Sequence, residues 1–231
     1  MCVELPKLRI VYMAVPKAAC TSVKTALAGI DDSSPISAED IQHDSDIVHK
    51  HYNTSRFRPH RWNPYCDGTW WRFSVVRDPL QRLLSVYTNR VVGLRELHNS
   101  PRLRKQTELS LDPDPDFFLQ NIRGYMALAS SIKHHALPTR LFIGPKPIRF
   151  DRIYRVDELD VLAEDLSAKS GKQVVIPRAN KSKNALSLAD LNETTINFLK
   201  QHLAEDYDHL GDYFSNPFDA PLVAPRLAAH S

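Results

Sequence analysis

The sequence predicts an α/β fold in which helices flank a central parallel sheet. Apolar, β-branched runs that are typical of buried strands alternate along the chain with segments that carry helix start and stop signals. The chain has 231 residues, 42% hydrophobic and 25% charged, which is enough for one sizeable core. We therefore expect one domain over residues 1–231.

The first half of the chain supplies two strand and helix pairs. "LRIVYMAV" (8–15) is expected to be a buried strand, followed by a helix that Thr21 or Ser22 caps and that runs to about Ala28. We expect a polar loop over 31–46 and a short strand at "IVHKHY" (47–52).

"WRFSVV" (71–76) has the unbroken apolar character of a central strand. In the helix that follows, Asp78 is the predicted N-cap and Pro79 the first helical residue. The apolar face of this helix is formed by Leu80, Leu83, Leu84, Tyr87 and Val91.

The second half continues the alternation after a linker over 100–116, whose prolines rule out a continuous helix. Helices are expected at about 117–133, at 157–171 with Gly171 as the stop, and at 188–210. Strands are expected at "FDRIYRV" (150–156) and at the start of "QVVIPRANKSKN" (173–184), which then becomes a basic loop.

The net charge and the cysteines indicate which partners and which cellular compartment to expect. A formal charge of +3 is too small to predict a nucleic-acid partner, so any electrostatic argument must be local. Cys2, Cys20 and Cys66 are odd in number and irregularly spaced, which favours reduced thiols in a cytoplasmic compartment. The N-terminus has no long apolar stretch, so we expect neither a secretory signal nor a transmembrane anchor, although a soluble catalytic domain cut from a larger protein would look the same.

The stretch "VYMAVPKAACTSVKTAL" (11–27) is where the first strand turns into a helix. Such a turn presents free backbone N–H groups and the positive end of the helix dipole, which together favour an anion. Lys17 adds a charge, and Thr21 and Ser22 add hydroxyl donors. Because Lys17 opens a loop that contains no glycine, a Walker-type nucleotide loop is disfavoured. The alternative is a plain turn with an exposed lysine.

A second candidate site lies in "RFSVVRDPLQRLLSVY" (72–87). Arg77 comes where the strand stops, and Ser85 follows about two turns into the helix, so a guanidinium and a hydroxyl can hold one phosphate together. Two alternatives are an ion pair between Arg77 and a carboxylate, and a magnesium-binding role for Asp78. The capping role explains Asp78 better, because Pro79 follows it.

"VPKAACTS" together with "VVRDPLQRLLSVY" resembles the paired signature of sulfotransferases that use 3′-phosphoadenosine-5′-phosphosulfate (PAPS). The first motif is similar to their 5′-phosphosulfate loop, especially in the carbohydrate (family 2-type) branch, and the second to their 3′-phosphate motif. The segments 176–191 and 199–214 also resemble the C-terminal part of that branch. The resemblance implies a P-loop-kinase-like three-layer fold, PAPS as the donor, 3′,5′-adenosine bisphosphate (PAP) as the product, and no metal.

The resemblance also implies the residues that hold the cofactor. The 5′-phosphosulfate would lie against Lys17, Ala18, Ala19, Cys20, Thr21 and Ser22, with Cys20 as a small packed residue. The 3′-phosphate would lie against Arg77 and Ser85. A basic loop closes over the cofactor elsewhere in the superfamily, and its counterpart here would be Arg178, Lys181 and Lys183; a solvated charge run is the alternative.

The histidines of "IVHKHYN" are candidates for a catalytic base, because sulfuryl transfer to a hydroxyl needs a group to take the acceptor's proton. In a strand, His49 and His51 would point to the same face. Some glycan sulfotransferases resemble this His-x-His arrangement, so we expect His51 to be the base and His49 a helper, with the two roles exchangeable. Glu39 is a reserve candidate for the base.

Other interpretations of the histidines stay open. His49 and His51 with His60 or Cys66 would make a zinc site, and both could be plain surface residues. His134 and His135 either line the acceptor pocket or interact with a helix end. The aromatic residues Trp62, Tyr65, Trp70 and Trp71 either stack on an acceptor or, as we favour, pack between strands.

The function predicted is sulfuryl transfer from PAPS to an acceptor hydroxyl by in-line displacement, with Lys17 stabilising charge on the leaving phosphate. The acceptor is expected to be a carbohydrate or glycan, or alternatively a small-molecule natural product. Two other hypotheses are an ATP-dependent kinase and a nucleotide-binding module without turnover. The sequence does not disclose the oligomeric state.

Overall fold

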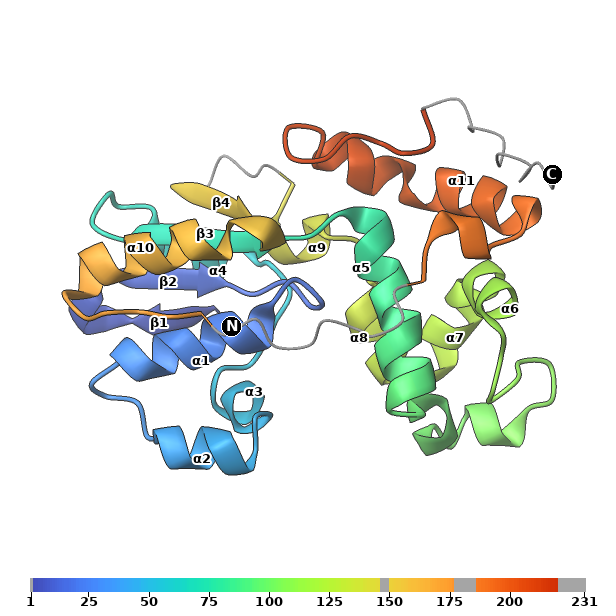
Figure 1. Ribbon diagram of the computed structural model, residues 1–231, viewed down its shortest axis with the longest axis horizontal. Coiled ribbons are helices and arrows are strands. Elements are labelled where there is room, and N and C mark those ends of the chain that lie inside the picture. The colour runs from blue at the N-terminus through green and yellow to red at the C-terminus, as the bar shows by residue number, and fades with distance from the viewer. Residues whose placement is uncertain (1, 146–149, 177–185, 220–231) are drawn as a thin grey trace, which may run out of the picture.

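The computed structural model describes residues 2–145, 150–176 and 186–219 and shows a four-stranded sheet beside a helical half (Figure 1). The strands are β1 (Val3–Leu5), β2 (Ile10–Met13), β3 (Trp71–Val76) and β4 (Arg152–Arg155), in the order β1-β2-β3-β4. β2, β3 and β4 are parallel, and β1 pairs with β2 in the antiparallel sense. The α/β prediction is confirmed, whereas β1 was not foreseen.

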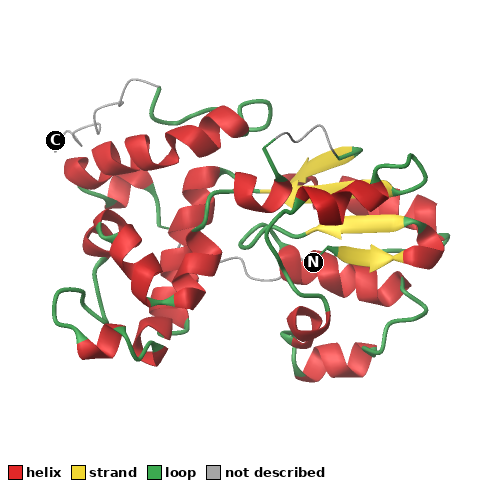
Figure 2. Cartoon of the chain, turned by 180° about the vertical axis from the view of Figure 1, so that it is seen from behind, coloured by secondary structure: helices red, strands yellow, loops and turns green. Residues whose placement is uncertain are grey.

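Helices cover both faces of the sheet, as the three-layer prediction requires (Figures 1 and 2). Successive residues of β2 point to opposite faces. Ile10 and Tyr12 pack in the cluster that contains α1 (Cys20–Ile30) and α10 (Leu159–Ser170). Val11 and Met13 pack on the other face, where α4 (Pro59–Trp62) and α9 (Arg140–Ile143) lie. Both faces of β2 are therefore packed in a hydrophobic core, and so are residues of the loop that follows it.

The helical half has a hydrophobic cluster of its own and begins where β3 ends. Its elements are α5 (Pro79–Val86), the π-helix η3 (Tyr87–Gly93), the 3-10 helices η4 (Glu96–Asn99) and η5 (Leu103–Lys105), α6 (Pro115–Gln120), α7 (Ile122–Leu128), α8 (Ser130–Ala136) and α11 (Glu193–His209). The remaining short 3-10 helices are η1 (Pro6–Leu8), η2 (Asn63–Tyr65), η7 (Val156–Glu158) and η8 (Leu188–Asp190).

Several elements form where local signals predict them. The Asp78 carboxylate accepts a hydrogen bond from the Gln81 N–H at 2.8 Å, and Pro79 is the first residue of α5. The predicted apolar face of α5 and η3 is buried. Gly171 ends α10 with φ 69°, a left-handed conformation that glycine adopts without strain.

Four predictions of secondary structure are wrong. Residues 31–46 contain α2 (Ala38–His43), which Ser37 and Asp40 cap reciprocally. Residues 47–52 form α3 (Ile47–His51) rather than a strand. The helix expected over 117–133 is divided into α6, α7 and α8. Residues 173–176 form no strand.

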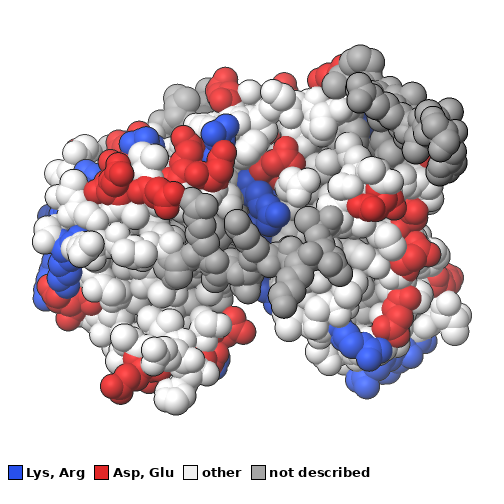
Figure 3. All heavy atoms as spheres, in the orientation of Figure 1, with Lys and Arg blue, Asp and Glu red and all other residues white. Residues whose placement is uncertain are grey.

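Charge is mixed over the surface. On the face that Figure 3 shows, acidic and basic side chains are interspersed over the sheet half, and Lys and Arg gather toward the lower right of the helical half. None of the helices in the described ranges is long and apolar enough to cross a membrane. Because the surface charge marks no single region, the site must be found from its local geometry.

Candidate active site

The loop between β2 and α1 is held in an unusual backbone conformation. Lys17 has φ 65° and Ala19 has φ 55°, both in the left-handed region that non-glycine residues seldom adopt. The Ala18 N–H donates to the Val15 carbonyl at 3.2 Å, and the Ala18 side chain is fully buried. Ala19 is the N-cap and α1 begins at Cys20, so the expectation that Thr21 or Ser22 caps this helix is wrong.

The Lys17 side chain crosses from this loop to the helical half. Its Nζ donates to the Asn89 side-chain oxygen of η3 at 2.6 Å. Burial lowers the pKa of Lys17 to about 8, and repulsion from Arg90 and Arg77 adds to that shift. An anion bound at the loop would relieve this repulsion and favour the charged ammonium.

Arg77 lies at the end of β3, beside the same loop. Its Nη1 donates to the Lys17 carbonyl oxygen at 3.4 Å, and burial lowers the pKa of Arg77. Ser85 is half-buried on α5, in the helix that Arg77 precedes. The structure therefore brings the two predicted phosphate motifs together at the ends of adjacent parallel strands.

The two histidines of α3 point in different directions, because residues two apart in a helix do not share a face. His49 faces α1: its Nε2 lies 2.8 Å from the Thr21 hydroxyl oxygen. His51 is exposed and its ring packs edge-on against Tyr52. The expectation that both share one face was wrong because it rested on a strand, and the structure brings only His49 to the loop.

Lys24 is a site residue that the sequence reasoning missed. It is fully buried on α1, and its Nζ lies 3.1 Å from His49 Nδ1 and donates to the Thr54 hydroxyl at 2.7 Å. Burial lowers the pKa of Lys24 to about 8. A signal was available: Lys24 lies two residues after Ser22 and four after Cys20, so it shares a helix face with the loop end.

Further basic side chains surround His49. Burial lowers the pKa of His49 to about 4, with repulsion from Lys24 adding to the shift and Arg90 and His134 acting more weakly. His135 is also affected: burial lowers its pKa to about 2, and its Nδ1 finds no hydrogen-bond partner among the described residues. Both histidines of α8 thus lie near the site, where the lysine and arginine side chains concentrate positive charge that favours a polyanion.

Other candidates do not join this group. Glu39 is exposed in the first turn of α2. The described residues contain no group of three His, Cys, Asp or Glu side chains placed to hold a metal, so the zinc interpretation gains no support. Arg178, Lys181 and Lys183 lie outside the described residues.

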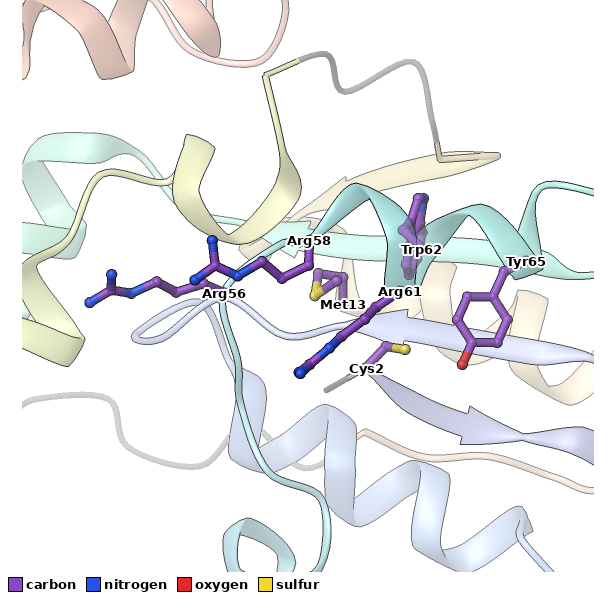
Figure 4. Close-up of a pocket in the computed structure, with 7 residues that line it drawn as sticks. All are labelled: Cys2, Met13, Arg56, Arg58, Arg61, Trp62 and Tyr65. Atoms are coloured by element: carbon purple, nitrogen blue, oxygen red, sulfur yellow. The ribbon is translucent and has the colours of Figure 1, made fainter.

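A pocket on the α4 face of the sheet is lined by Cys2, Met13, Arg56, Arg58, Arg61, Trp62 and Tyr65 (Figure 4). Figure 4 shows the side chains of Arg56 and Arg58 extending toward the end of the sheet where the loop follows β2. These two residues flank the buried Phe57, whose N–H donates to the Leu141 carbonyl at 2.8 Å, so both arginines face the opposite, open side. Within the described part of the chain, none of the three arginines makes an ion pair.

One aromatic side chain of this pocket packs in the protein core. Trp62 is 1% exposed and its ring packs against Phe57, Tyr65 and Phe150. Trp62 therefore packs in the core, as the packing interpretation predicts.

This arrangement can bind an anionic phosphoryl or sulfuryl group and take a proton beside it. The loop supplies backbone N–H groups at the start of α1 and the Lys17 ammonium. Arg77 extends the positive region along the strand ends, and His49 offers a neutral imidazole at the Thr21 hydroxyl.

Comparisons with known proteins agree with this chemistry. A family model described as "Sulfotransferase family" matches residues 3–213. Carbohydrate sulfotransferase 14 from Homo sapiens is 36% identical over 91 residues, a stretch that makes up 38% of this chain and 23% of that protein. The matched stretch is thus less than a quarter of that relative's length. No solved structure matches the chain.

Proposed function

The chain belongs to the sulfotransferase family, and on that premise we propose that it transfers a sulfuryl group from PAPS to a hydroxyl of a carbohydrate. The observation that carries the proposal is the convergence of the Lys17 loop, Arg77 and His49 at the ends of β2 and β3. A donor that carries a phosphosulfate and a separate phosphate needs two anion sites; in this proposal the loop holds the first group, and Arg77 and Ser85 hold the second.

In the proposed mechanism, the acceptor oxygen attacks sulfur in line with the leaving phosphate. Lys17 and the N–H groups of the loop stabilise the charge that grows on that phosphate, which is the largest contribution expected from preorganised donors. Lys17 would have to leave Asn89 or share its hydrogens, since an ammonium has three of them. Reaction requires neither a metal nor a covalent bond to the protein in this scheme.

We assign the proton-accepting role to His49 rather than His51. His49 lies against Thr21 of the loop, whereas His51 is exposed on the other side of α3. The two residues provide a matched pair for a test: His49→Ala should lower kcat by about 10²–10⁴, the usual effect of losing a general base, and His51→Ala should leave it nearly unchanged. Equal losses of kcat in both variants would contradict the assignment of His49 rather than His51 as the base.

The proposed acceptor carries negative charge close to the hydroxyl that reacts. The support is the group of three arginines at the pocket near the loop, Arg56, Arg58 and Arg61, which make no ion pair with any of the residues that the structure describes. Guanidinium groups bind carboxylates and sulfates in bidentate fashion. Arg58→Gln should raise KM for an acidic oligosaccharide and leave KM for its neutral counterpart unchanged; the same substitution at Arg104, an exposed residue of η5, is the control.

The test of the whole proposal is an assay of PAP release with PAPS and a panel of acidic oligosaccharides, neutral oligosaccharides and small phenols. Parallel reactions contain ATP and magnesium in place of PAPS and are followed by the release of ADP. Turnover with ATP alone would make the protein a kinase. Stabilisation by PAP without turnover on any acceptor would make it a binding module, because a ligand that binds only the folded state raises Tm by mass action.

A further inference from the structure

Lys24 is a buried cation to which the proposed mechanism gives no role. Its side chain is fully buried in α1, and its Nζ has two polar neighbours in different segments, His49 Nδ1 at 3.1 Å and the Thr54 hydroxyl at 2.7 Å. The side chain of a lysine is rarely buried to this degree unless its ammonium group is paired. The contact to His49 joins Lys24 to the residue that we propose as the base.

The hydrogen-bond donors and acceptors around Lys24 determine which ring nitrogen of His49 carries a hydrogen. An ammonium group only donates, so His49 Nδ1 must accept when Lys24 is charged. A neutral imidazole that accepts at Nδ1 carries its hydrogen at Nε2, and that hydrogen is then donated to the Thr21 hydroxyl oxygen at 2.8 Å. In this form Nε2 has no lone pair with which to take a proton from an acceptor.

Loss of one proton from Lys24 permits the reverse arrangement. The amine then has a lone pair that can accept from His49 Nδ1–H, and the Lys24 proton passes to solvent. The single hydrogen of the imidazole moves from Nε2 to Nδ1, and Nε2 becomes an acceptor. We propose that Lys24 is a positioning residue that sets the tautomer of His49, and that the base-competent His49 is the form found with neutral Lys24. The catalytic part rests on the proposed function; the tautomer part does not.

The surroundings place this change within an accessible pH range. The pKa of His49 is lowered to about 4, first by burial and then by Lys24, so the imidazole is neutral near pH 7 and its tautomer is the only variable left. The pKa of Lys24 is lowered to about 8, chiefly by burial. The charged and titratable groups that act on the pair are Cys20 of α1, Asp46 before α3, Arg90 of η3 and His134 of α8.

The tautomer can be read without turnover. We would label the histidines with ¹⁵N and follow the His49 nitrogens by NMR from pH 6 to 10, assigning them by their loss in His49→Gln. The expected result is a protonated Nε2 at low pH that gives way to a protonated Nδ1 with a midpoint near the Lys24 pKa of about 8. A protonated Nδ1 already at pH 6, or no change up to pH 10, would overturn the proposal.

Two variants sharpen the test. Lys24→Met keeps the length of the side chain but cannot donate, so the pH-dependent change should disappear. Lys50→Met is the matched control, because Lys50 is next to His49 in sequence, exposed and paired with Asp44. Persistence of the wild-type titration in Lys24→Met would refute the role of Lys24; if that variant does not fold, the wild-type titration still decides.

Activity then tests the catalytic part on its own. With saturating PAPS, the rate of sulfuryl transfer should rise with pH through the pKa that Lys24 has in the complex, which the bound anion raises above its value in the free protein. The rise should occur in the wild-type protein and in Lys50→Met, and should be lost in Lys24→Met. A tautomer change in the NMR titration without the corresponding rise in rate would refute the catalytic part alone. A protein inactive with every acceptor would refute the proposed function, and the NMR result would still stand.

Discussion

Arg82 joins three helices of the helical half through its buried guanidinium. It is 1% exposed on α5 and donates to the carbonyls of His135 at 3.0 Å and Leu137 at 2.7 Å, next to α8. Its Nη2 also lies 3.5 Å from the carboxylate of Asp206, a buried residue of α11. Replacement by methionine, Arg82→Met, fills a similar length but removes every one of these contacts.

The loss expected follows from the burial of the pair. Removal of one partner of a buried ion pair destabilises a protein by about 3–5 kcal/mol, because the other charge is left uncompensated. Among the described residues, the Asp206 carboxylate would keep only the Thr139 N–H at 2.8 Å, and two carbonyls would lose their donor. For a chain of this size, 1 kcal/mol shifts Tm by about 2–4 °C, so Arg82→Met should lower Tm by about 6–20 °C.

Arg140→Met is the matched control. Arg140 of α9 forms an ion pair with Glu205, which lies on α11 next to Asp206, with 2.7 Å between the Arg140 Nε and the Glu205 carboxylate. The two side chains are 42% and 62% exposed. Such a pair contributes about 0–1 kcal/mol, so its loss should lower Tm by at most about 4 °C. Differential scanning calorimetry measures both variants. Equal shifts in Arg82→Met and Arg140→Met would refute the reasoning that burial gives the Arg82 pair its importance.

Three further predictions concern charge at the site. Lys17→Met should lower kcat by about 10²–10³ with little change in Tm, the effect of losing one oxyanion donor; an unchanged kcat in the PAP-release assay would remove Lys17 from catalysis. Binding of PAP near pH 8 should take up protons, because an anion raises the lowered pKa values of Lys17 and Lys24; calorimetric binding enthalpies that do not depend on the buffer would contradict this. Acid should destabilise the fold between about pH 6.5 and 4, because the pKa of His49 is near 6.5 in the unfolded chain and about 4 in the folded protein. The contribution of His49 to the free energy of unfolding is therefore complete above pH 6.5 and is lost as protons bind at lower pH. In His49→Gln, the fall of Tm over this range should be smaller than in the wild-type protein.

The parts of the fold predicted correctly are those where short-range signals agree with the tertiary packing. β3 and α5 follow the prediction because an apolar run, the Asp78 cap and Pro79 each act within a few residues. The two motifs predicted to bind the cofactor lie together because parallel strands end at the same edge of the sheet. These features need no knowledge of distant contacts.

The errors arose where a distant contact decides the local structure. The segment 47–52 is too short for its periodicity to separate a strand from a helix. Its helix is held by Val48, which is fully buried, and by the contacts of His49 with Thr21 and Lys24 of α1. Lys24 was missed for the same reason: a lysine within a short helix is expected to be exposed, and only α3 and Thr54 explain why it is buried.

The glycine-free loop presents a final problem, since its conformation would suit glycine. The left-handed conformation destabilises the folded protein by about 1–2 kcal/mol for each residue other than glycine, and both Lys17 and Ala19 adopt it. Ala19→Gly would relieve this strain in the folded protein, but the more flexible unfolded chain of the glycine variant opposes the gain by about 0.4–1 kcal/mol. The net gain is therefore about 0–1.6 kcal/mol, and Tm should rise by at most about 6 °C. The benefit of alanine must then lie in a loop that is rigid before the ligand arrives, with Ala18 buried beneath it. We therefore expect Ala19→Gly to weaken PAP binding and lower kcat although its Tm is equal to or slightly above that of the wild-type protein, measured by calorimetry and the PAP-release assay. Unchanged PAP affinity in this variant would show that the strain serves no purpose in binding.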